Sequence, residues 1–327
     1  MRRRFSKFVF RRPFTRGVVG VLSGIIFFGI LATGVLAEVE TSYLYKLSNF
    51  SGPIPFNKSN FHVDEERNEL YVVDIREKDI IIFNDQGMEV YRFGGDGSLG
   101  SVVDVAVGGD GNILVLSKGS SNSSIIVCNF RGEPVSELEL KDLPPDFSGF
   151  SPDRMVYRRE RLYLVDTSSL KIAVTDVNGF FRNVYDLGAL VGIEEKKRAG
   201  TELGGFSVDR QGNMLFTVPV LFSAFTLTPD GKITSFGKPG SAPGKFNVVG
   251  GIVADDRGFY YVADRLKSVV IIFDKHFKFQ TQFGYRGFRP HNLIGPKNLV
   301  LDSNGRLYVS QLGNRGVSVF KITYNNR

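Results

Sequence analysis

Few side chains in this sequence could bind a metal ion or carry out acid–base chemistry. There are three histidines, His62, His276 and His291, and one cysteine, Cys128. Zinc sites use three or four Cys, His or carboxylate ligands, and no paired-cysteine or Cys-x-x-Cys-His spacing is present. His276 lies in the segment DKHFK, which is predicted to be a turn. The sequence therefore predicts no metal site, no cofactor and no catalytic residue.

Two other patterns could suggest chemistry, and both have a simpler explanation. The glycine-rich segment 94–100, GGDGSLG, is similar to a dinucleotide-binding loop, but no helix is predicted to follow it. Asp74 and Asp166 could form an acid–base pair, but each occupies the same position in a repeated pattern. A role in bracing turns explains both aspartates.

The repeated pattern is a short apolar strand that ends in a polar residue, and it occurs six times. The copies are YVVD from residue 71, LVLS from 114, YLVD from 163, FTVP from 216, YVAD from 261 and YVSQ from 308. The intervals between copies lie in the range of about 40–50 residues that is typical of propeller blades. Six similar units are therefore predicted.

Each unit is predicted to be a four-stranded antiparallel sheet. An apolar strand and a turn with Asp and Gly precede four of the copies, as in 252–262, IVADDRGFYYV, and a third and a fourth strand follow most copies. This arrangement indicates an all-β fold, a six-bladed β-propeller. The last unit ends after its third strand, so the residues near 41–50 are predicted to supply its outer strand and remove an exposed edge.

Binding residues of a propeller are expected on loops at the channel mouths or between blades. The loops after the repeated strand and the linkers between units should share one face. The candidates that they bring to this face are Arg76, Lys118, Arg265, Arg289, His291 and Asn314.

The repeats resemble those of the NHL family of propellers. The segment 236–284 carries its Phe-Gly linker, its Asp-Gly hairpin and its Tyr-Val-x-Asp strand. The segment 283–320 matches almost as well, with Pro296 in the family's proline position, and 69–87 is a third good copy. The resemblance covers residues 57–323 and implies the six-bladed fold. Related propellers imply two enzymatic alternatives. One is a metal-dependent lyase that uses channel histidines. The other is a lactonase-like hydrolase with a set of calcium ligands at the channel mouth, for which Asn298 and Asp104 lie near the right strand starts.

The first 37 residues are predicted to be a targeting segment. Seven basic residues and no acidic residue occur there, and residues 17–37 form an uncharged apolar run that is long enough to span a bilayer. A cleaved signal peptide and a retained anchor helix both fit, and so do general and twin-arginine export. Residues 38–327 are then the propeller and lie on the extracytoplasmic, periplasmic side, either secreted or anchored to the membrane.

The net charge of +7 comes from the targeting segment alone, because the rest of the chain has 34 basic and 34 acidic residues. A neutral body lacks the general electrostatic footprint of nucleic-acid binding. The sequence thus predicts a non-catalytic scaffold in the cell envelope that binds an envelope protein, or a small ligand or glycan. The alternative is the metal-dependent lyase or lactonase-like hydrolase at the channel mouth.

Overall fold

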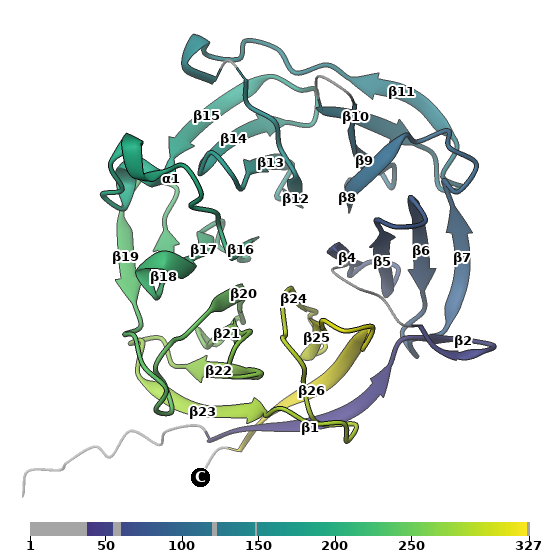
Figure 1. Ribbon diagram of the computed structural model, residues 1–327. Helices are drawn as coiled ribbons and strands as arrows, with labels where there is room; N and C mark the ends of the chain where they lie inside the picture. Colours follow the sequence, from purple (N-terminus) through teal and green to yellow (C-terminus); the bar gives the residue numbers. More distant parts are fainter. Residues whose placement is uncertain (1–37, 55–59, 120–122, 148, 326–327) are drawn as a thin grey trace, which may run out of the picture. The chain divides into compact units, whose positions relative to one another are not determined.

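Six four-stranded antiparallel sheets surround a central channel in the part of the chain that the computed structural model describes, which is residues 38–54, 60–119, 123–147 and 149–325. The protein is an all-β, six-bladed propeller with almost no helix (Figure 1). Contacts divide the chain into Met1–Leu36 and Ala37–Arg327, and every described residue belongs to the second unit. The helix predicted within 1–37 lies outside the described residues.

The blades follow one another along the chain, and each is built from its inner strand outward. Blade 1 contains β4 (Asn60–Asp64), β5 (Glu69–Asp74), β6 (Asp79–Phe83) and β7 (Glu89–Phe93). Blade 2 contains β8 (Ser101–Val107), β9 (Ile113–Lys118), β10 (Ser123–Cys128) and β11 (Pro134–Leu138). Blade 3 contains β12 (Arg154–Arg158), β13 (Arg161–Asp166), β14 (Lys171–Asp176) and β15 (Phe181–Asp186).

The other three blades complete the ring. Blade 4 contains β16 (Gly205–Val208), β17 (Met214–Val218), β18 (Ser223–Leu227) and β19 (Ile233–Phe236). Blade 5 contains β20 (Val249–Ala254), β21 (Tyr260–Asp264), β22 (Val269–Phe273) and β23 (Phe279–Gly284). Blade 6 contains β24 (Leu299–Leu301), β25 (Arg306–Ser310), β26 (Val317–Asn325) and β1 (Glu38–Lys46). Outside the blades lie β2 (Ser48–Asn49), β3 (Gly52–Pro53) and the 3-10 turns η1 (Pro145–Phe147) and η3 (Pro219–Leu221).

The antiparallel order gives the ring two faces that carry different loops. The turns after the first and third strands of every blade lie on one face, here called the hairpin face. The turns after the second strands and the linkers to the next blade lie on the other, here called the linker face. Asp255 shows how the predicted hairpin turns form: its Oδ1 accepts hydrogen bonds from the backbone N–H of Arg257 and Phe259, both at 2.9 Å, and Gly258 takes a φ of 83°.

Apolar side chains from neighbouring sheets hold the blades together. Between blades 3 and 4, Val165 and Ile172 pack with Phe216 and Phe225, whose stacked ring centroids are 5.0 Å apart. Full burial of such a side chain stabilises the fold by about 1.5–3 kcal/mol. Cys128 is buried in the same way between blades 1 and 2. A sheet can bury both faces only between two neighbours, so the ring has to close.

Glycines allow the inner strands of blades 4, 5 and 6 to approach closely. A Cβ atom on Gly205 would lie 2.5 Å from the Cα of Gly251, and one on Gly251 would lie 2.7 Å from the backbone nitrogen of Leu299. Both distances are too short for a side chain to fit. The backbone N–H of Gly251 donates to the carbonyl of Lys297 at 2.5 Å. Backbone therefore forms this part of the channel wall.

The sequence LGALVGIEEKKRAGTE over 187–202 predicts an insertion between blades 3 and 4 with one short helix over 189–198, and the structure differs from this prediction. The structure has a helical turn, α1 (Leu187–Leu190), and a separate 3-10 turn, η2 (Glu195–Lys197). Gly192 between them takes a φ of 76°, which a continuous right-handed helix does not allow. No helix among the described residues is long and apolar enough to cross a bilayer.

The two ends of the described chain meet in blade 6. Strand β1 is the outermost strand of this blade and pairs with β26 in antiparallel register, with Glu38 opposite Asn325 and Thr41 opposite Ile322. The outer strand that the sequence places near 41–50 thus corresponds to β1. Val39 on this strand is only 6% exposed and packs into the core between blades 5 and 6.

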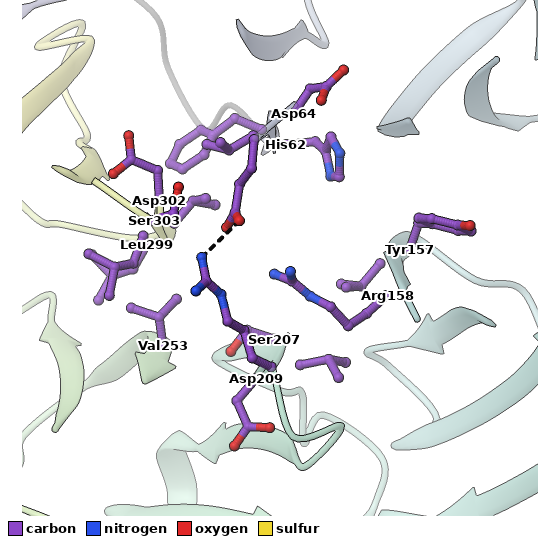
Figure 2. Close-up of a pocket in the computed structure, with 18 of the residues that line it drawn as sticks. His62, Asp64, Tyr157, Arg158, Ser207, Asp209, Val253, Leu299, Asp302 and Ser303 are labelled. Atoms are coloured by element: carbon purple, nitrogen blue, oxygen red, sulfur yellow. Dashed lines mark hydrogen bonds and ion pairs between the residues drawn. The ribbon is translucent and has the colours of Figure 1, made fainter. Parts of the chain in front are cut away.

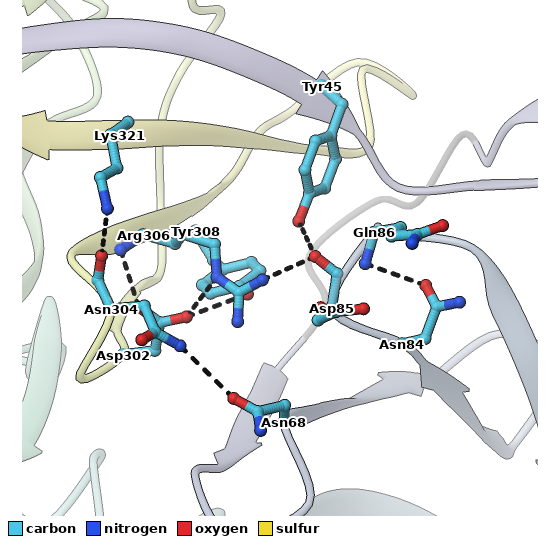
Figure 3. Close-up of polar contacts among 10 residues, drawn as sticks. All are labelled: Tyr45, Asn68, Asn84, Asp85, Gln86, Asp302, Asn304, Arg306, Tyr308 and Lys321. Atoms are coloured by element: carbon cyan, nitrogen blue, oxygen red, sulfur yellow. Dashed lines mark hydrogen bonds and ion pairs between the residues drawn. The ribbon is translucent and has the colours of Figure 1, made fainter.

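Polar contacts fasten the seam between blade 6 and blade 1, as Figure 3 shows. The carbonyl of Asp85 in blade 1 accepts hydrogen bonds from Tyr45 Oη at 2.9 Å and from Arg306 Nη1 at 2.6 Å. Asn304 of blade 6 donates to Asn68 of blade 1 at 3.4 Å. The contact of Arg306 with Asp85 and the contact of Asn304 with Asn68 each join residues that are more than two hundred positions apart in the sequence.

We predict that Val39→Asp destabilises the whole propeller, because it buries an unpaired carboxylate in the core that β1 closes. The expected loss is about 3 kcal/mol of unfolding free energy, measured by urea denaturation. Ser42→Asp places the same side chain on an exposed position of the same strand and should change stability by less than about 0.5 kcal/mol. Equal effects of the two substitutions would contradict closure by β1.

Candidate functional site

A cavity of about 560 Å³ occupies the centre of the ring. All six inner strands and their first hairpin turns line it, so every blade contributes to its wall. In Figure 2, His62, Arg158, Ser207, Val253 and Leu299 surround the hollow from five different blades. We call this space the central cavity, and its size lies within the range of small-molecule sites, about 300–1,000 Å³.

A chain of polar side chains crosses the central cavity at its linker-face end. Arg154 Nη2 donates to Asn298 Oδ1 at 3.0 Å, which joins blade 3 to blade 6 on the opposite side of the ring. Asn298 Nδ2 donates to Asn60 Oδ1 at 3.0 Å, and Asn60 Nδ2 donates to the carbonyl of Val103 at 2.8 Å. These hydrogen bonds connect four blades at one level of the channel.

Asp104 lies beside this chain and is buried. Its Oδ1 accepts from the N–H of Val105 at 2.9 Å and its Oδ2 accepts from the N–H of Met155 at 2.8 Å. Burial raises the pKa of Asp104 to about 7, although Arg154 and the two N–H groups lower it in part. Its second hydrogen bond reaches the next blade, so Asp104 fixes the spacing between the inner strands of blades 2 and 3.

A second arginine crosses the cavity at its hairpin-face end. Arg210, in the first turn of blade 4, forms an ion pair with Glu65 of blade 1, with Nη2 and Oε2 2.8 Å apart, and a second pair with Asp256 of blade 5. Arginines therefore span the ring at both ends of the cavity.

The histidines are not brought together as a metal-dependent lyase would require. His62 lies in the cavity wall, whereas His291 is exposed on the linker between blades 5 and 6, and His276 lies in a turn of the hairpin face. Within the described ranges, no three His, Cys, Asp or Glu side chains form a group that could hold a metal ion.

The calcium ligands implied by the lactonase-like alternative do not fit this site either. Asn298 and Asp104 do reach the central cavity, as their positions near strand starts suggested. However, Asn298 Oδ1 accepts a hydrogen bond from Arg154, and both oxygens of Asp104 accept from backbone N–H groups. The cation that these oxygens face is the guanidinium of Arg154.

The aspartate pair considered for acid–base chemistry is structural. Asp74 Oδ1 accepts hydrogen bonds from the N–H groups of Arg76 and Glu77 at 3.0 and 3.3 Å. Asp166 accepts in the same way from Ser168 and Ser169 and also receives the N–H of Ser151. Both side chains brace the turn after a second strand, as the repeat predicted.

The six predicted binding residues lie on the linker face, whereas the central cavity opens among the turns of the hairpin face. None of the six lines that cavity. Arg76 and Lys118 belong to blades 1 and 2, and Arg76 pairs with Glu77 at 2.8 Å. Arg265, Arg289, His291 and Asn314 belong to blades 5 and 6 and the linker between them.

The linker face of blades 5 and 6 carries a concentration of positive charge. We define the basic linker patch as residues 236–248, 264–268, 284–297 and 310–317. These segments contain eight basic residues: Lys238, Lys245, Arg265, Lys267, Arg286, Arg289, Lys297 and Arg315. Their only acidic residue, Asp264, is fully buried, where it accepts hydrogen bonds from backbone N–H groups of its own turn and of the preceding linker.

Hydrogen bonds join the four segments into one continuous surface. Lys267 Nζ donates to the carbonyls of Ala242 and Lys245 at 3.1 and 3.0 Å. Ser268 Oγ accepts from the N–H of Gly295 at 3.3 Å. The N–H of Leu312 donates to the carbonyl of Ile294 at 3.0 Å.

Large apolar side chains are exposed within the same patch. Phe288 is 85% exposed, Leu266 is 66% exposed and Tyr285 is 55% exposed. The guanidinium of Arg315 lies 5.6 Å from the centre of the Phe288 ring. Its Nε and Nη2 atoms, like the Nε of Arg265, are buried without a hydrogen-bond partner among the described residues. Exposed apolar groups beside cations are typical of protein-binding surfaces.

The sequence did not predict the arginines of the central cavity. Arg154 and Arg158 lie four residues apart on the inner strand β12, and residues at an even spacing on a strand point to the same side. Two arginines on one side of a strand that should be apolar were the available signal. Asn298, which accepts from Arg154, and Glu65, which pairs with Arg210, are 144 and 145 positions away from those arginines. Only the closed ring brings them together.

No family model matches this sequence, and no match is found among curated proteins. Several solved structures have the same fold. A streptogramin B lyase structure is 12% identical over 87% of this chain and 98% of that chain, with a TM-score of 0.55. A luciferin-regenerating enzyme is 11% identical over 88% and 95%, with a TM-score of 0.57. A gluconolactonase from Xanthomonas campestris is 12% identical over 88% and 90%, with a TM-score of 0.52.

At these identities the comparisons show the fold alone. They identify the chain as similar to six-bladed β-propellers whose names include lyases and a gluconolactonase. They do not transfer an activity, because propellers of one architecture host unrelated functions.

The imidazole of His62 should make the fold sensitive to acid. Burial and, to a smaller extent, the positive charge of Arg158 lower the pKa of His62 to about 4, against the opposing effect of Asp64. An unfolded histidine has a pKa of about 6.5. Protonation therefore favours the unfolded chain, and the stability that neutral His62 contributes is lost as the pH falls from about 6.5 toward 4.

We predict that His62→Gln removes this part of the acid sensitivity. Between about pH 7 and about pH 5, the unfolding free energy of the variant should rise relative to the original protein by about 2 kcal/mol. Urea denaturation at the two pH values measures the difference. A difference that is the same at both values would show that His62 is not held neutral by the cavity.

Proposed function

We propose that this protein is an exported, NHL-type propeller that acts as a non-catalytic binding module in the cell envelope, and that it binds an acidic protein partner through the basic linker patch. The observation that carries the proposal is the patch itself, with eight basic residues and no exposed acidic residue in its four segments. Support for the NHL type comes from the Tyr-Val-x-Asp strand of blade 5 and from the Phe-Gly linkers that precede blades 5 and 6.

The charge distribution favours a partner with an acidic surface. The body of the chain is formally neutral, so the patch is a local excess of charge that acids elsewhere balance. A one-signed patch accelerates association with an oppositely charged surface and raises specificity more than it raises affinity. The interaction should therefore weaken when salt screens the charges.

The exposed side chains of Phe288, Leu266 and Tyr285 supply the apolar part of such an interface. Aromatic and arginine residues at the centre of an interface contribute most of its binding energy. Phe288 is held beside Arg315 by a cation–π contact, so this pair presents a ring and a guanidinium together. An acidic protein segment with apolar residues complements both groups, whereas a purely anionic polymer would leave the apolar surface uncovered.

Export is proposed from the N-terminal segment. A basic stretch followed by the uncharged run 17–37 is typical of export signals and of anchors with the N-terminus in the cytoplasm. Either form places the propeller outside the cytoplasm, where nucleic acid is not an available partner. The proposed partner is accordingly a protein of the envelope.

The patch predicts a specific loss of binding on charge reversal. The double substitution Arg286→Glu and Arg289→Glu should lower the affinity for a poly-glutamate probe at least about tenfold, measured by fluorescence anisotropy. Both side chains are exposed and have no hydrogen bond or ion pair among the described residues, so the fold should tolerate the change. Binding by the original protein should weaken between about 50 mM and about 200 mM salt.

The control for this test is Lys275→Glu and Lys278→Glu. These lysines are exposed on the hairpin face of the same blade, and the double substitution alters the net charge by the same amount. The control should keep its affinity for poly-glutamate. If both double variants lose affinity equally, net charge and not the patch determines binding, and the proposal fails.

The location is tested by fusing reporters to the C-terminus of the full chain in a bacterial host. We expect alkaline phosphatase, which becomes active only outside the cytoplasm, to be active in the fusion. A phosphatase-inactive fusion, together with a strongly fluorescent cytoplasmic reporter fused at the same position, would contradict export.

A further inference from the structure

Arg158 is a cation of the central cavity without a compensating partner. Its guanidinium forms no hydrogen bond or ion pair with any described residue, and its Nε atom is buried and unsatisfied. Figure 2 shows its side chain extending from the wall of blade 3 toward the middle of the hollow. A partly buried guanidinium without a counter-charge is unfavourable, because its lost hydration is not replaced.

Six of the seven described carboxylates around the hairpin-face mouth of the cavity are already engaged. Asp64 pairs with Arg67 at 2.7 Å, and Asp302 pairs with Arg306 at 2.5 Å. Glu65 and Asp256 both pair with Arg210. Asp209 and Asp255 accept the backbone N–H groups of their own turns. The seventh, Glu66, is exposed and forms no ion pair with Arg158, so none of the seven neutralises it.

At the linker-face end of the cavity, the groups around Arg154 do not supply a negative charge that could neutralise Arg158. The guanidinium of Arg154 donates to the neutral amide of Asn298, and the nearby Asp104 is occupied by two backbone N–H groups. His62 is the neutral aromatic group next to Arg158, while Val253 and Leu299 add apolar surface from blades 5 and 6. The middle of the cavity thus combines the uncompensated positive charge of Arg158 with apolar walls.

We infer that the central cavity is a binding site for a small organic monocarboxylate, whose carboxylate is held by the guanidinium of Arg158 and whose apolar body lies against Val253 and Leu299. A planar guanidinium can donate two parallel N–H···O hydrogen bonds to a carboxylate. One uncompensated cation balances one negative charge, so a monoanion fits better than a phosphate dianion. The site lies on the opposite side of the ring from the basic linker patch, and its test is independent of the proposed protein partner.

The experiment is isothermal titration of the purified full-length chain with benzoate, a monocarboxylate with an apolar body. Benzyl alcohol, which has the same ring without the charge, and inorganic phosphate are titrated in parallel. We expect benzoate to bind, and benzyl alcohol and phosphate to bind at least about tenfold more weakly. Tighter binding of phosphate, equal binding of benzyl alcohol, or no binding of benzoate would each overturn the inference.

Substitutions locate the bound anion. Arg158→Gln should lower the affinity for benzoate at least about tenfold, and Arg158→Lys should restore part of it. Arg257→Gln is the matched control, because Arg257 also lines the cavity but its guanidinium lies over the ring of Tyr324, 4.1 Å from the centre. Unchanged affinity in Arg158→Gln, or an equal loss in Arg257→Gln, would overturn the assignment to Arg158.

A second readout does not depend on the folding of a variant. The chain has only three histidines, so the NMR signals of His62 can be assigned and titrated in the original protein. Because the positive charge of Arg158 contributes to the low pKa of His62, a bound carboxylate should move that pKa upward. A His62 titration that saturating benzoate leaves unchanged would show that the anion binds elsewhere.

Discussion

The hydrogen-bonded pairing of β1 with β26 is the constraint on which the rest of the structure depends. It joins the first described strand to the last one and gives blade 6 its fourth strand. Each blade buries its two faces only against its neighbours, so an incomplete blade 6 would expose the apolar sides of blades 5 and 1. The central cavity depends on the same closure, because its wall comes from all six inner strands.

The closed ring also determines on which face the charged side chains lie. The first hairpin turns of blades 1, 4, 5 and 6 begin with an aspartate that accepts the N–H groups of the turn: Asp64, Asp209, Asp255 and Asp302. These side chains are needed for turn formation, and they give the hairpin face its acidic groups. In blades 5 and 6 the turns of the linker face use the buried Asp264 and the neutral Gln311 instead. These two turns therefore add no exposed carboxylate to the basic linker patch.

Local signals in the sequence were sufficient to predict the fold. The repeated strand, the Asp-Gly turns and the incomplete last unit are short-range patterns, and each of them depends on backbone conformation within a few residues. The insertion after blade 3 was predicted less well. Its polar composition favoured one helix, but Gly192 interrupts it, and the ion pair of Arg198 with Asp186 at 2.8 Å holds it against β15.

The candidate sites could be predicted only in part, because they depend on contacts between distant residues. The topology places the loop residues Arg265, Arg289, His291 and Asn314 on one face, but the neutral total charge concealed how unevenly the charge is distributed. Asn298 and Asp104 do reach the channel, where Arg154 and backbone groups already satisfy them. Arg154 and Arg210 contact residues on the opposite side of the ring, and no local pattern specifies those partners.

The central claim is that the basic linker patch binds an acidic protein partner, and photo-crosslinking in intact cells tests it most directly. A photoreactive residue replaces Phe288 in the patch, and the same residue at Lys275, on the opposite face of blade 5, is the reference. The account predicts one discrete adduct with an acidic envelope protein from position 288, which disappears when Arg286 and Arg289 are replaced by glutamate. The same adducts from both positions, or an adduct from position 288 that survives charge reversal, would contradict it.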